Sequence, residues 1–436
     1  MKSAFLSRRL LSGVTLLAAL VLALSAPLAL AAEAGGSLTK SATSAAAVAG
    51  PDDQTVDKQA QAKHWPKIYL TVFNNGYSGD PMPQETEKFE KLLKTITSQG
   101  NFNAVMCRYS EDREALCKKY NILMVVDLLA AGYHVFQNPK ECEELCHQLR
   151  GDPTIAAYHL WSDRFGKAGR GRARDIDNVH QWDPTHATYS GTYQSGGMSY
   201  LAKSDFIAYY DFSWKRGPHK NFSNLLTAWS LAKLHDNRIG RYVETDPGRP
   251  GEGNYLRSLY LQNTSIACGL RCCLWFIGSR IMDMNTLEFN QLGKDAAKVN
   301  AWTKPLWSEI PRLGLPTAIY STPISKDSGN HDLPAEGGAL KMPPGLEGHD
   351  FPKDFWLQPV RGEFVMGISK YDGSCDGAYV ANHNAYAEQD VKLKVAKGRH
   401  ARIFNRRSGK FEDLPVVNGT IAFKLEKAGG QLLLFP

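Results

Sequence analysis

The sequence predicts a (β/α)8 barrel followed by an antiparallel β-sandwich domain, and two observations carry this prediction. Eight strand-like runs alternate with helix-like segments between residues 67 and 310, which is the length and rhythm of a (β/α)8 barrel. After Gly314, short strand-like runs separated by turn residues follow one another without any segment of helical period. That second pattern is typical of an antiparallel sandwich.

The eight runs of the first part are continuously apolar rather than alternating, which indicates a parallel sheet buried on both faces. A doubly wound open sheet has the same alternation of elements and is the main rival. No Gly-rich phosphate loop follows the first run, so the barrel is favoured. The runs cover residues 67–77, 101–109, 122–129, 154–163, 186–196, 205–214, 239–248 and 270–278.

The segments between these runs have helical spacing. In residues 84–100, for example, Phe89, Leu92 and Ile96 share one stripe, and Gly100 stops the helix. We therefore place the barrel at residues 63–312 and the β-sandwich at 313–436. Residues 325–353 within the second part are rich in Gly, Pro, Asp and Lys and are expected to form a long loop or linker.

The N-terminus predicts export. A basic start precedes an apolar run over residues 10–24, and a small-residue A-x-A site ends at Ala31, so residues 1–31 have the features of a cleaved signal peptide. An uncleaved membrane anchor is the rival, but Ser25 and Pro27 interrupt the apolar run before the cleavage site. We expect a secreted, periplasmic or cell-surface protein with no stable membrane span after cleavage.

Residues 32–62 are small and polar without apolar periodicity, which predicts a disordered Ala/Ser-rich leader. The remaining composition is ordinary for a globular protein, with 43% hydrophobic and 22% charged residues overall. The formal charge of +7 includes three basic residues of the signal segment. Such a small excess does not indicate a nucleic-acid partner, and no feature of the sequence sets an oligomeric state.

The chain has eight cysteines, but a protein of this size does not need disulfides to fold. Several of them lie in apolar strands or helices, where a free thiol behaves as a small hydrophobe. Cys142 and Cys146 share a helix face, yet no second ligand pair at zinc spacing accompanies them. We therefore expect no metal and no cofactor, and the sequence leaves disulfide pairing open.

Reactive side chains of a (β/α)8 barrel lie at the C-terminal ends of the strands. No G-x-S-x-G elbow, H-E-x-x-H motif or P-loop occurs. Instead, carboxylates stand among aromatic residues, a combination that suits glycosidic cleavage because aromatic faces stack on sugar rings. The carboxylates are Asp127, Asp163, Asp211, Glu244 and Asp246, and the surrounding residues include Tyr158, His159, Trp161, Tyr193, Tyr210, Trp214, Tyr242 and Trp275.

The stretch GDPTIAAYHLWSDRFG, residues 151–166, resembles the fourth-strand region of glycoside hydrolase barrels of the large retaining clan. The resemblance implies that Asp163 occupies the acid/base position. Tyr242-Val243-Glu244 falls where that clan keeps its nucleophile, and Trp275 resembles its sugar-platform aromatic. The C-terminal runs resemble the β-domains common in such enzymes.

The sequence departs from the clan's pattern at its acid. The clan has Asn-Glu where this chain has Ser162-Asp163, and the shorter Asp leaves open whether the reaction retains or inverts configuration. Arg164 replaces the usual Pro and would lower the pKa of Asp163 if it lay near. Because a general acid needs a raised pKa, a second pair stays open: Asp163 as nucleophile and Asp211 as acid, which resembles the α-galactosidase type of barrel.

The leading hypothesis is an exported glycoside hydrolase that acts on a polysaccharide or glycan, with Glu244 as nucleophile or base, Asp163 as acid and Asp211 as the alternative partner. The alternatives are a carbohydrate-binding barrel that has lost its catalytic acid and a cell-surface structural protein. Each of these residues also has a structural interpretation. The carboxylates could be a salt-bridged loop residue (Asp163), a helix cap or a partner of Arg241 (Glu244), a turn cap (Asp211) and a strand-end group bonded to backbone amides (Asp127). His159 could be a barrel-interior imidazole, and Trp275 could be rim packing. The predicted substrate-binding residues are His159, Trp161, Tyr193, Tyr210, Trp214 and Trp275.

Overall fold

The computed structural model describes residues 65–75, 82–129, 138–161, 169–192, 203–211, 218–244, 254–276, 278–322 and 353–436. At residues 161, 192, 211 and 244, which end strands, it describes the backbone alone. The predicted signal peptide and leader, residues 1–62, lie outside these ranges.

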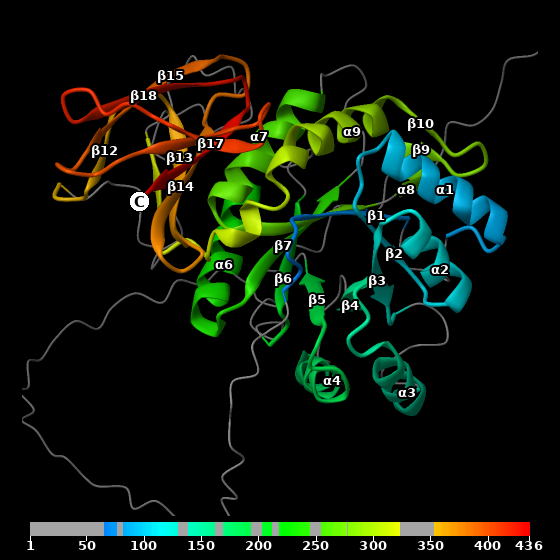
Figure 1. Cartoon of the computed structure of the whole chain (residues 1–436). Coiled ribbons are helices and arrows are strands. Elements are labelled where there is room, and N and C mark those ends of the chain that lie inside the picture. Colours follow the sequence, from blue (N-terminus) through cyan, green and yellow to red (C-terminus); the bar gives the residue numbers. More distant parts are fainter. Residues whose placement is uncertain are drawn as a thin grey trace, which may run out of the picture. The chain divides into compact units, whose positions relative to one another are not determined.

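The first part of the chain is a closed barrel of eight parallel strands in sequential order, with the last strand paired to the first (Figure 1). This closure confirms the predicted (β/α)8 barrel and excludes the open doubly wound sheet. The strands are β1 (Leu70–Asn74), β2 (Ala104–Cys107), β3 (Leu123–Asp127), β4 (Ile155–Trp161), β5 (Ala187–Thr192), β6 (Phe206–Asp211), β7 (Arg238–Glu244) and β8 (Leu270–Phe276).

The connecting helices lie outside the strands (Figure 1). Polar caps set where two of them begin: Ser110 accepts from the Arg113 amide before α2, and Asn290 accepts from the Gly293 amide before α9. In the part of the chain that the structure describes, no helix combines the length and apolarity needed to cross a membrane. The main helices are α1 (Thr86–Ser98), α2 (Glu111–Lys119), α3 (Pro139–Leu149), α4 (Gly169–Trp182), α6 (Pro218–His235), α7 (Asn254–Ala267) and α9 (Gln291–Thr303).

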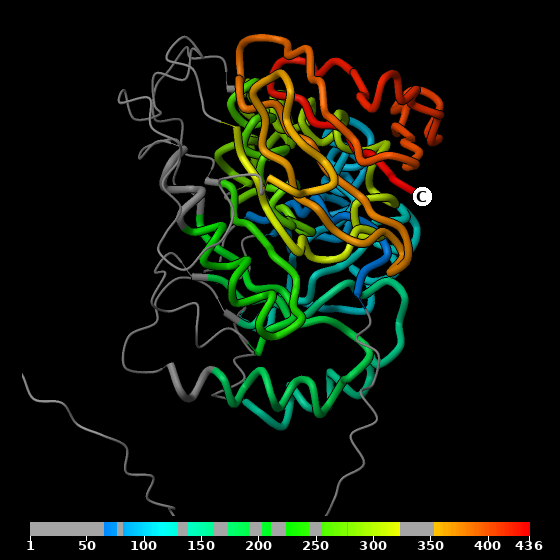
Figure 2. Tube along the Cα trace, turned by 90° about the vertical axis from the view of Figure 1, so that its left-hand side faces the viewer, coloured from blue at the N-terminus to red at the C-terminus, as the bar shows by residue number. Residues whose placement is uncertain are grey.

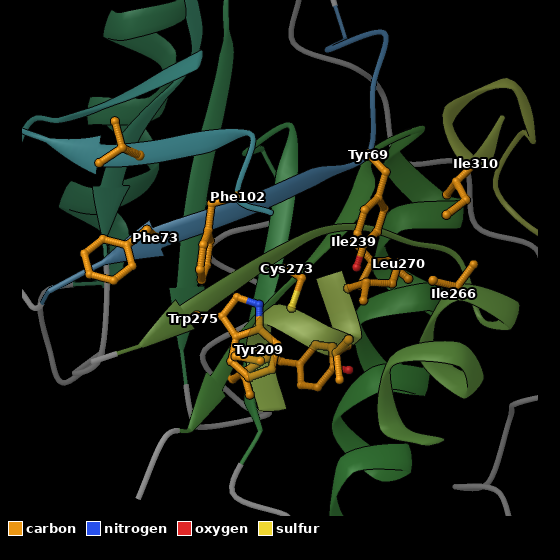
Figure 3. Close-up of a cluster of buried hydrophobic side chains, with 14 of the residues drawn as sticks. Tyr69, Phe73, Phe102, Tyr209, Ile239, Ile266, Leu270, Cys273, Trp275 and Ile310 are labelled. Atoms are coloured by element: carbon orange, nitrogen blue, oxygen red, sulfur yellow. The ribbon is translucent and has the colours of Figure 1, made fainter. Parts of the chain in front are cut away.

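The strands separate two layers of core. Alternate residues of each strand point to opposite faces, so one set fills the barrel interior and the other packs against the helices. The inner cluster includes Tyr189, Phe206, Tyr210, Tyr242 and Leu274. Figure 3 shows part of the outer cluster, including Phe73, Tyr209, Ile239, Cys273 and Trp275.

The C-terminal part is antiparallel throughout. A six-stranded sheet of order β11-β13-β14-β19-β16-β17 accompanies a three-stranded sheet of order β12-β15-β18. Their strands, yellow for β11 and orange to red for the others, gather together in Figure 2. A shared core with Leu357, Val380 and Leu433 confirms the predicted sandwich. The strands are β11 (Ala318–Ser321), β12 (Leu357–Arg361), β13 (Phe364–Tyr371), β14 (Cys375–Asn382), β15 (Gln389–Val395), β16 (Arg402–Asn405), β17 (Lys410–Asp413), β18 (Thr420–Leu425) and β19 (Gly430–Phe435).

Helix α7 joins the barrel to the six-stranded sheet. The Asn263 amide donates to the Ala428 carbonyl at 2.9 Å, and its oxygen accepts from the Tyr379 hydroxyl at 2.6 Å. The two backbones approach so closely that a Cβ at Gly367 would lie 1.7 Å from the carbonyl oxygen of Ala267. Glycine is therefore required at that point of contact. Barrel and sheets belong to one compact unit, Ala60–Pro436.

All eight cysteines are free thiols, and all but Cys375 are buried. Burial raises the pKa of Cys117 and of Cys142 to about 12 in each case. These thiols are therefore protonated and act as small apolar side chains, as their positions in the sequence predict.

Candidate active site at the C-terminal end of the barrel

The C-terminal ends of β3, β4 and β7 are connected by a chain of three buried side chains. Nδ1 of His159 lies 2.9 Å from Oδ1 of Asp127, and Nε2 lies 2.9 Å from the Tyr242 hydroxyl. Asp127 also accepts from the Leu129 amide at 3.0 Å, which holds its carboxylate in place. His159 and Tyr242 have no exposed surface, and Asp127 is 5% exposed.

The chemistry of Asp127 assigns the proton on Nδ1 of His159. A carboxylate only accepts, so Nδ1 of His159 carries the hydrogen that it donates to Asp127. Nε2 lies within hydrogen-bond distance of the Tyr242 hydroxyl, a group that can either donate or accept. The phenol, the imidazole and the carboxylate therefore form one continuous hydrogen-bonded chain.

Aromatic rings pack around Tyr242 and close the barrel below the strand ends. The Tyr210 ring stacks on it with centroids 4.3 Å apart and an interplanar angle of 4°. Tyr189 meets it edge-on at 5.4 Å, and Phe276 meets it edge-on at 6.3 Å. We call Tyr189, Tyr210, Tyr242 and Phe276 the aromatic floor. Burial, with the neighbouring Cys272 thiol second, raises the pKa of Tyr189 well above its usual value, so its phenol stays neutral.

Two glycines make room for this floor. A Cβ at Gly191 would lie 2.1 Å from Cε2 of Tyr242, and a Cβ at Gly240 would lie 2.6 Å from Cε2 of Tyr189. Each of the two strands, β5 and β7, thus supplies one tyrosine ring and one glycine that receives the other strand's ring. Any larger residue at either glycine would displace a ring.

Register places Glu244 and Asp211 on different faces of the barrel sheet. Glu244 pairs with Phe276, a floor residue on the inner face, and Asp211 pairs with Val243. The Val243 side chain belongs to the outer cluster. Because residues directly opposite one another in a parallel pair share a face, Glu244 is an inner-face position and Asp211 an outer-face position.

Of the other predicted site residues, some lie outside the described residues and others lie at this end of the barrel. Asp163, Tyr193 and Trp214 lie outside the described residues, and Trp161 is described in its backbone as the last residue of β4. Tyr210 does lie at this end of the barrel, but it is 3% exposed and covered by Tyr242.

Two predicted substrate-binding residues need correction. His159 has no exposed surface and both ring nitrogens are engaged, so it is the barrel-interior imidazole rather than a residue that contacts sugar. Trp275 is 1% exposed in the outer cluster, and its Nε1 donates to Asn300 of α9 at 3.1 Å (Figure 3). Strand alternation explains why Trp275 is buried against the helices, because it pairs with Val243 on the outer face.

The role of Tyr242 as the centre of this end of the barrel is not predicted from the sequence. A signal for it exists in the spacing Gly240-x-Tyr242-x-Glu244 on one strand and Tyr189-x-Gly191 on another. Among the described residues, no group of three or more His, Cys, Asp or Glu side chains is placed to hold a metal ion.

Comparisons with known proteins concern the fold. No family model matches the chain, and no curated protein matches it. Similar solved structures include an α-amylase from Anoxybacillus (9% identity, TM-score 0.45, covering 85% of this chain and 98% of that one). A family 5 glycoside hydrolase from Bacteroides vulgatus has 11% identity and a TM-score of 0.46, covering 84% of this chain and 89% of that one. A family 27 β-L-arabinopyranosidase from Geobacillus stearothermophilus has 9% identity and a TM-score of 0.43, covering 85% and 97%.

These similar structures are glycoside hydrolases, the class that the sequence resembles. At 9–11% identity and TM-scores below 0.5, the likeness assigns no residue, substrate or activity to this chain.

Proposed function

We propose that the protein is an exported glycoside hydrolase that cleaves glycosidic bonds in a polysaccharide or glycan with a pair of carboxylates. The observation that carries this proposal is the position of Glu244. It ends β7 on the inner face, two residues after Tyr242, and pairs in register with Phe276 of the aromatic floor. The C-terminal end of a strand in a closed barrel is the position from which the residues of barrel enzymes act.

Glu244 is the nucleophile or base in this proposal, and Asp163 is the acid that protonates the leaving oxygen. The glycosidic C–O bond breaks while either Glu244 attacks the anomeric carbon or it takes a proton from the water that does so. Trp161, Tyr193 and Trp214 are the proposed sugar-ring contacts, since their aromatic faces suit stacking. Asp211 is the less favoured partner because its register places it on the outer face.

The test is sugar release from a panel of aryl glycosides and polysaccharides, measured as kcat and KM with the purified full chain. We expect Glu244→Gln and Asp163→Asn each to lower kcat about 10²–10⁴-fold, and Asp211→Asn to change it little. Asp413→Asn is the matched control, because the Asp413 side chain is 97% exposed on the C-terminal sheet. No turnover by the natural chain, or full activity of Glu244→Gln, would overturn the proposal.

One observation favours a second candidate, a barrel that binds carbohydrate without cleaving it. Arg164 directly follows Asp163 in the sequence, and a neighbouring guanidinium lowers a carboxyl pKa, which disfavours a general acid. This candidate predicts glycan affinity in calorimetry with no reducing sugar released. Measurable release from the glycan that binds would exclude it.

Export is the other part of the proposal. It is supported by the basic start, the apolar run and the small-residue site that ends at Ala31. N-terminal sequencing of the protein recovered outside the cytoplasm should read from Ala32. Recovery of an intact Met1 chain from the membrane fraction would instead support the uncleaved anchor.

A further inference from the structure

We propose that Tyr242 is a positioning residue: its hydrogen bond to His159 ties the end of β7 to the end of β4 and so holds the Glu244 position in place. The inference rests on the proposed function for its catalytic consequence. We call this hydrogen bond between Tyr242 and His159 the tie, and it exists independently of any substrate.

The tie joins strands that are not neighbours in the barrel. Two strands, β5 and β6, lie between β4 and β7 in the closed sheet, so the backbone ladder does not set their separation directly. The 2.9 Å bond between Nε2 of His159 and the Tyr242 hydroxyl crosses the interior between them. Both side chains are fully buried, and therefore water does not compete for this bond.

Both ends of the tie are held rigidly. Asp127 fixes the imidazole plane and its tautomer through Nδ1. On the other side, Tyr210 covers one face of the Tyr242 ring, and the missing Cβ of Gly191 leaves space for its edge. The phenol therefore has one orientation, and the backbone of β7 is held with it two residues before Glu244.

A different role for Tyr242 is excluded by its burial. A hydroxyl bonded to an imidazole that is oriented by a carboxylate has the arrangement of an activated nucleophile. Tyr242 has no exposed surface, however, and the rings of Tyr189, Tyr210 and Phe276 pack against it. Substrate has no access to the oxygen, so the residue acts through the strand that carries it.

The experiment compares Tyr242→Phe with Tyr189→Phe in the full chain. Both variants remove one buried hydroxyl from the aromatic floor and keep the ring. The Tyr189 hydroxyl has the weakly bonding Cys272 thiol beside it, whereas removal of the Tyr242 hydroxyl breaks its 2.9 Å bond to Nε2 of His159. A third variant, Gly191→Ala, keeps every polar group but pushes on the Tyr242 ring.

The first measurement needs no substrate. In hydrogen exchange read by mass spectrometry, Tyr242→Phe and Gly191→Ala should speed amide exchange about tenfold in peptides covering β4 and β7. Peptides from β1 and β2 should exchange as in the natural chain, and Tyr189→Phe should resemble the natural chain throughout. Unchanged exchange of β4 and β7 in Tyr242→Phe would overturn the tie, as would an equal effect of Tyr189→Phe.

The second measurement is kinetic. On a glycoside that the natural chain cleaves, Tyr242→Phe should lower kcat about 10- to 100-fold while KM changes by less than about threefold. A loss confined to KM, or no loss, would overturn the positioning role even if the exchange result holds. If the natural chain cleaves no glycoside, the proposed function fails, and the exchange comparison alone still decides the tie.

Discussion

The hydroxyl of Tyr260 lies 2.9 Å from Nδ1 of His383, and the two rings stack with centroids 6.0 Å apart. Tyr260 belongs to α7 of the barrel, and His383 directly follows β14 of the C-terminal sheet. Both residues are buried, and burial lowers the pKa of His383 to about 3. The junction of the two parts of the chain therefore depends on a neutral imidazole.

This junction predicts a loss of stability in acid. The unfolded chain binds a proton at His383 below its ordinary pKa of about 6.5, whereas the folded chain does so only near 3. The folded chain therefore loses no stability through His383 above about pH 7. Its unfolding free energy declines as the pH falls from the ordinary pKa of 6.5 toward the folded pKa of about 3. We expect about 2 kcal/mol of unfolding free energy to be lost by about pH 5 through this group.

Urea unfolding at several pH values checks the prediction. Although His383→Asn should be less stable near neutral pH, its unfolding free energy should fall less between about pH 7 and 5 than that of the natural chain. His400→Asn is the control, because that histidine is exposed and should leave the slope unchanged. Identical slopes for His383→Asn and the natural chain would contradict the assignment.

Replacement of Gly240 by alanine should lower the stability of the barrel. Gly240→Ala would place a methyl group 2.6 Å from the Tyr189 ring, and overpacking of this kind costs about 1–3 kcal/mol of unfolding free energy. The double variant Gly240→Ala with Tyr189→Leu removes the clashing ring edge. In denaturant unfolding, the double variant should therefore be more stable than the sum of the two single losses predicts. Strict additivity would show that the ring and the glycine do not interact.

Trp275 should matter for stability and not for sugar binding. Trp275→Phe removes the hydrogen bond to Asn300 and shrinks a fully buried side chain, at a cost of about 1–3 kcal/mol of unfolding free energy. Trp214→Phe, at a proposed sugar contact, should have the opposite profile, with weaker glycan affinity and unchanged stability. Calorimetric titration and thermal unfolding of both variants separate the two roles. Weaker glycan affinity of Trp275→Phe at unchanged stability would contradict a purely structural role for Trp275.

The eight thiols should react in two classes. Cys375 is half-buried and the other cysteines are buried, so a thiol reagent should label about one site in the native chain and all eight in denaturant. Reaction at Cys375 should be slow near neutral pH, because burial raises its thiol pKa. Cys375→Ser should abolish the native labelling. Fewer than eight reactive thiols in denaturant without reductant would instead reveal a disulfide.

The sequence by itself determined the architecture of this protein. Local sequence predicts each strand and helix. The apolar run Leu123–Asp127 forms β3, and the stripe of Phe89, Leu92 and Ile96 forms the buried face of α1. Repeated eight times, that local alternation predicts a barrel or an open sheet, and the missing phosphate loop favours the barrel that the pairing of β8 with β1 confirms. The change of rhythm after Gly314 predicts the sandwich. The strand ends, and with them Glu244, follow from the same local information.

The tertiary structure alone decided what the side chains at those ends do. His159 contacts a tyrosine 83 residues away, and Tyr260 contacts a histidine 123 residues away, so no local pattern specifies either pair. The face of Trp275 depended on the register between β7 and β8, because a shift of one residue moves a side chain from one face to the other. Long-range register and packing therefore turned two predicted sugar contacts into structural residues and made Tyr242 the centre of the site.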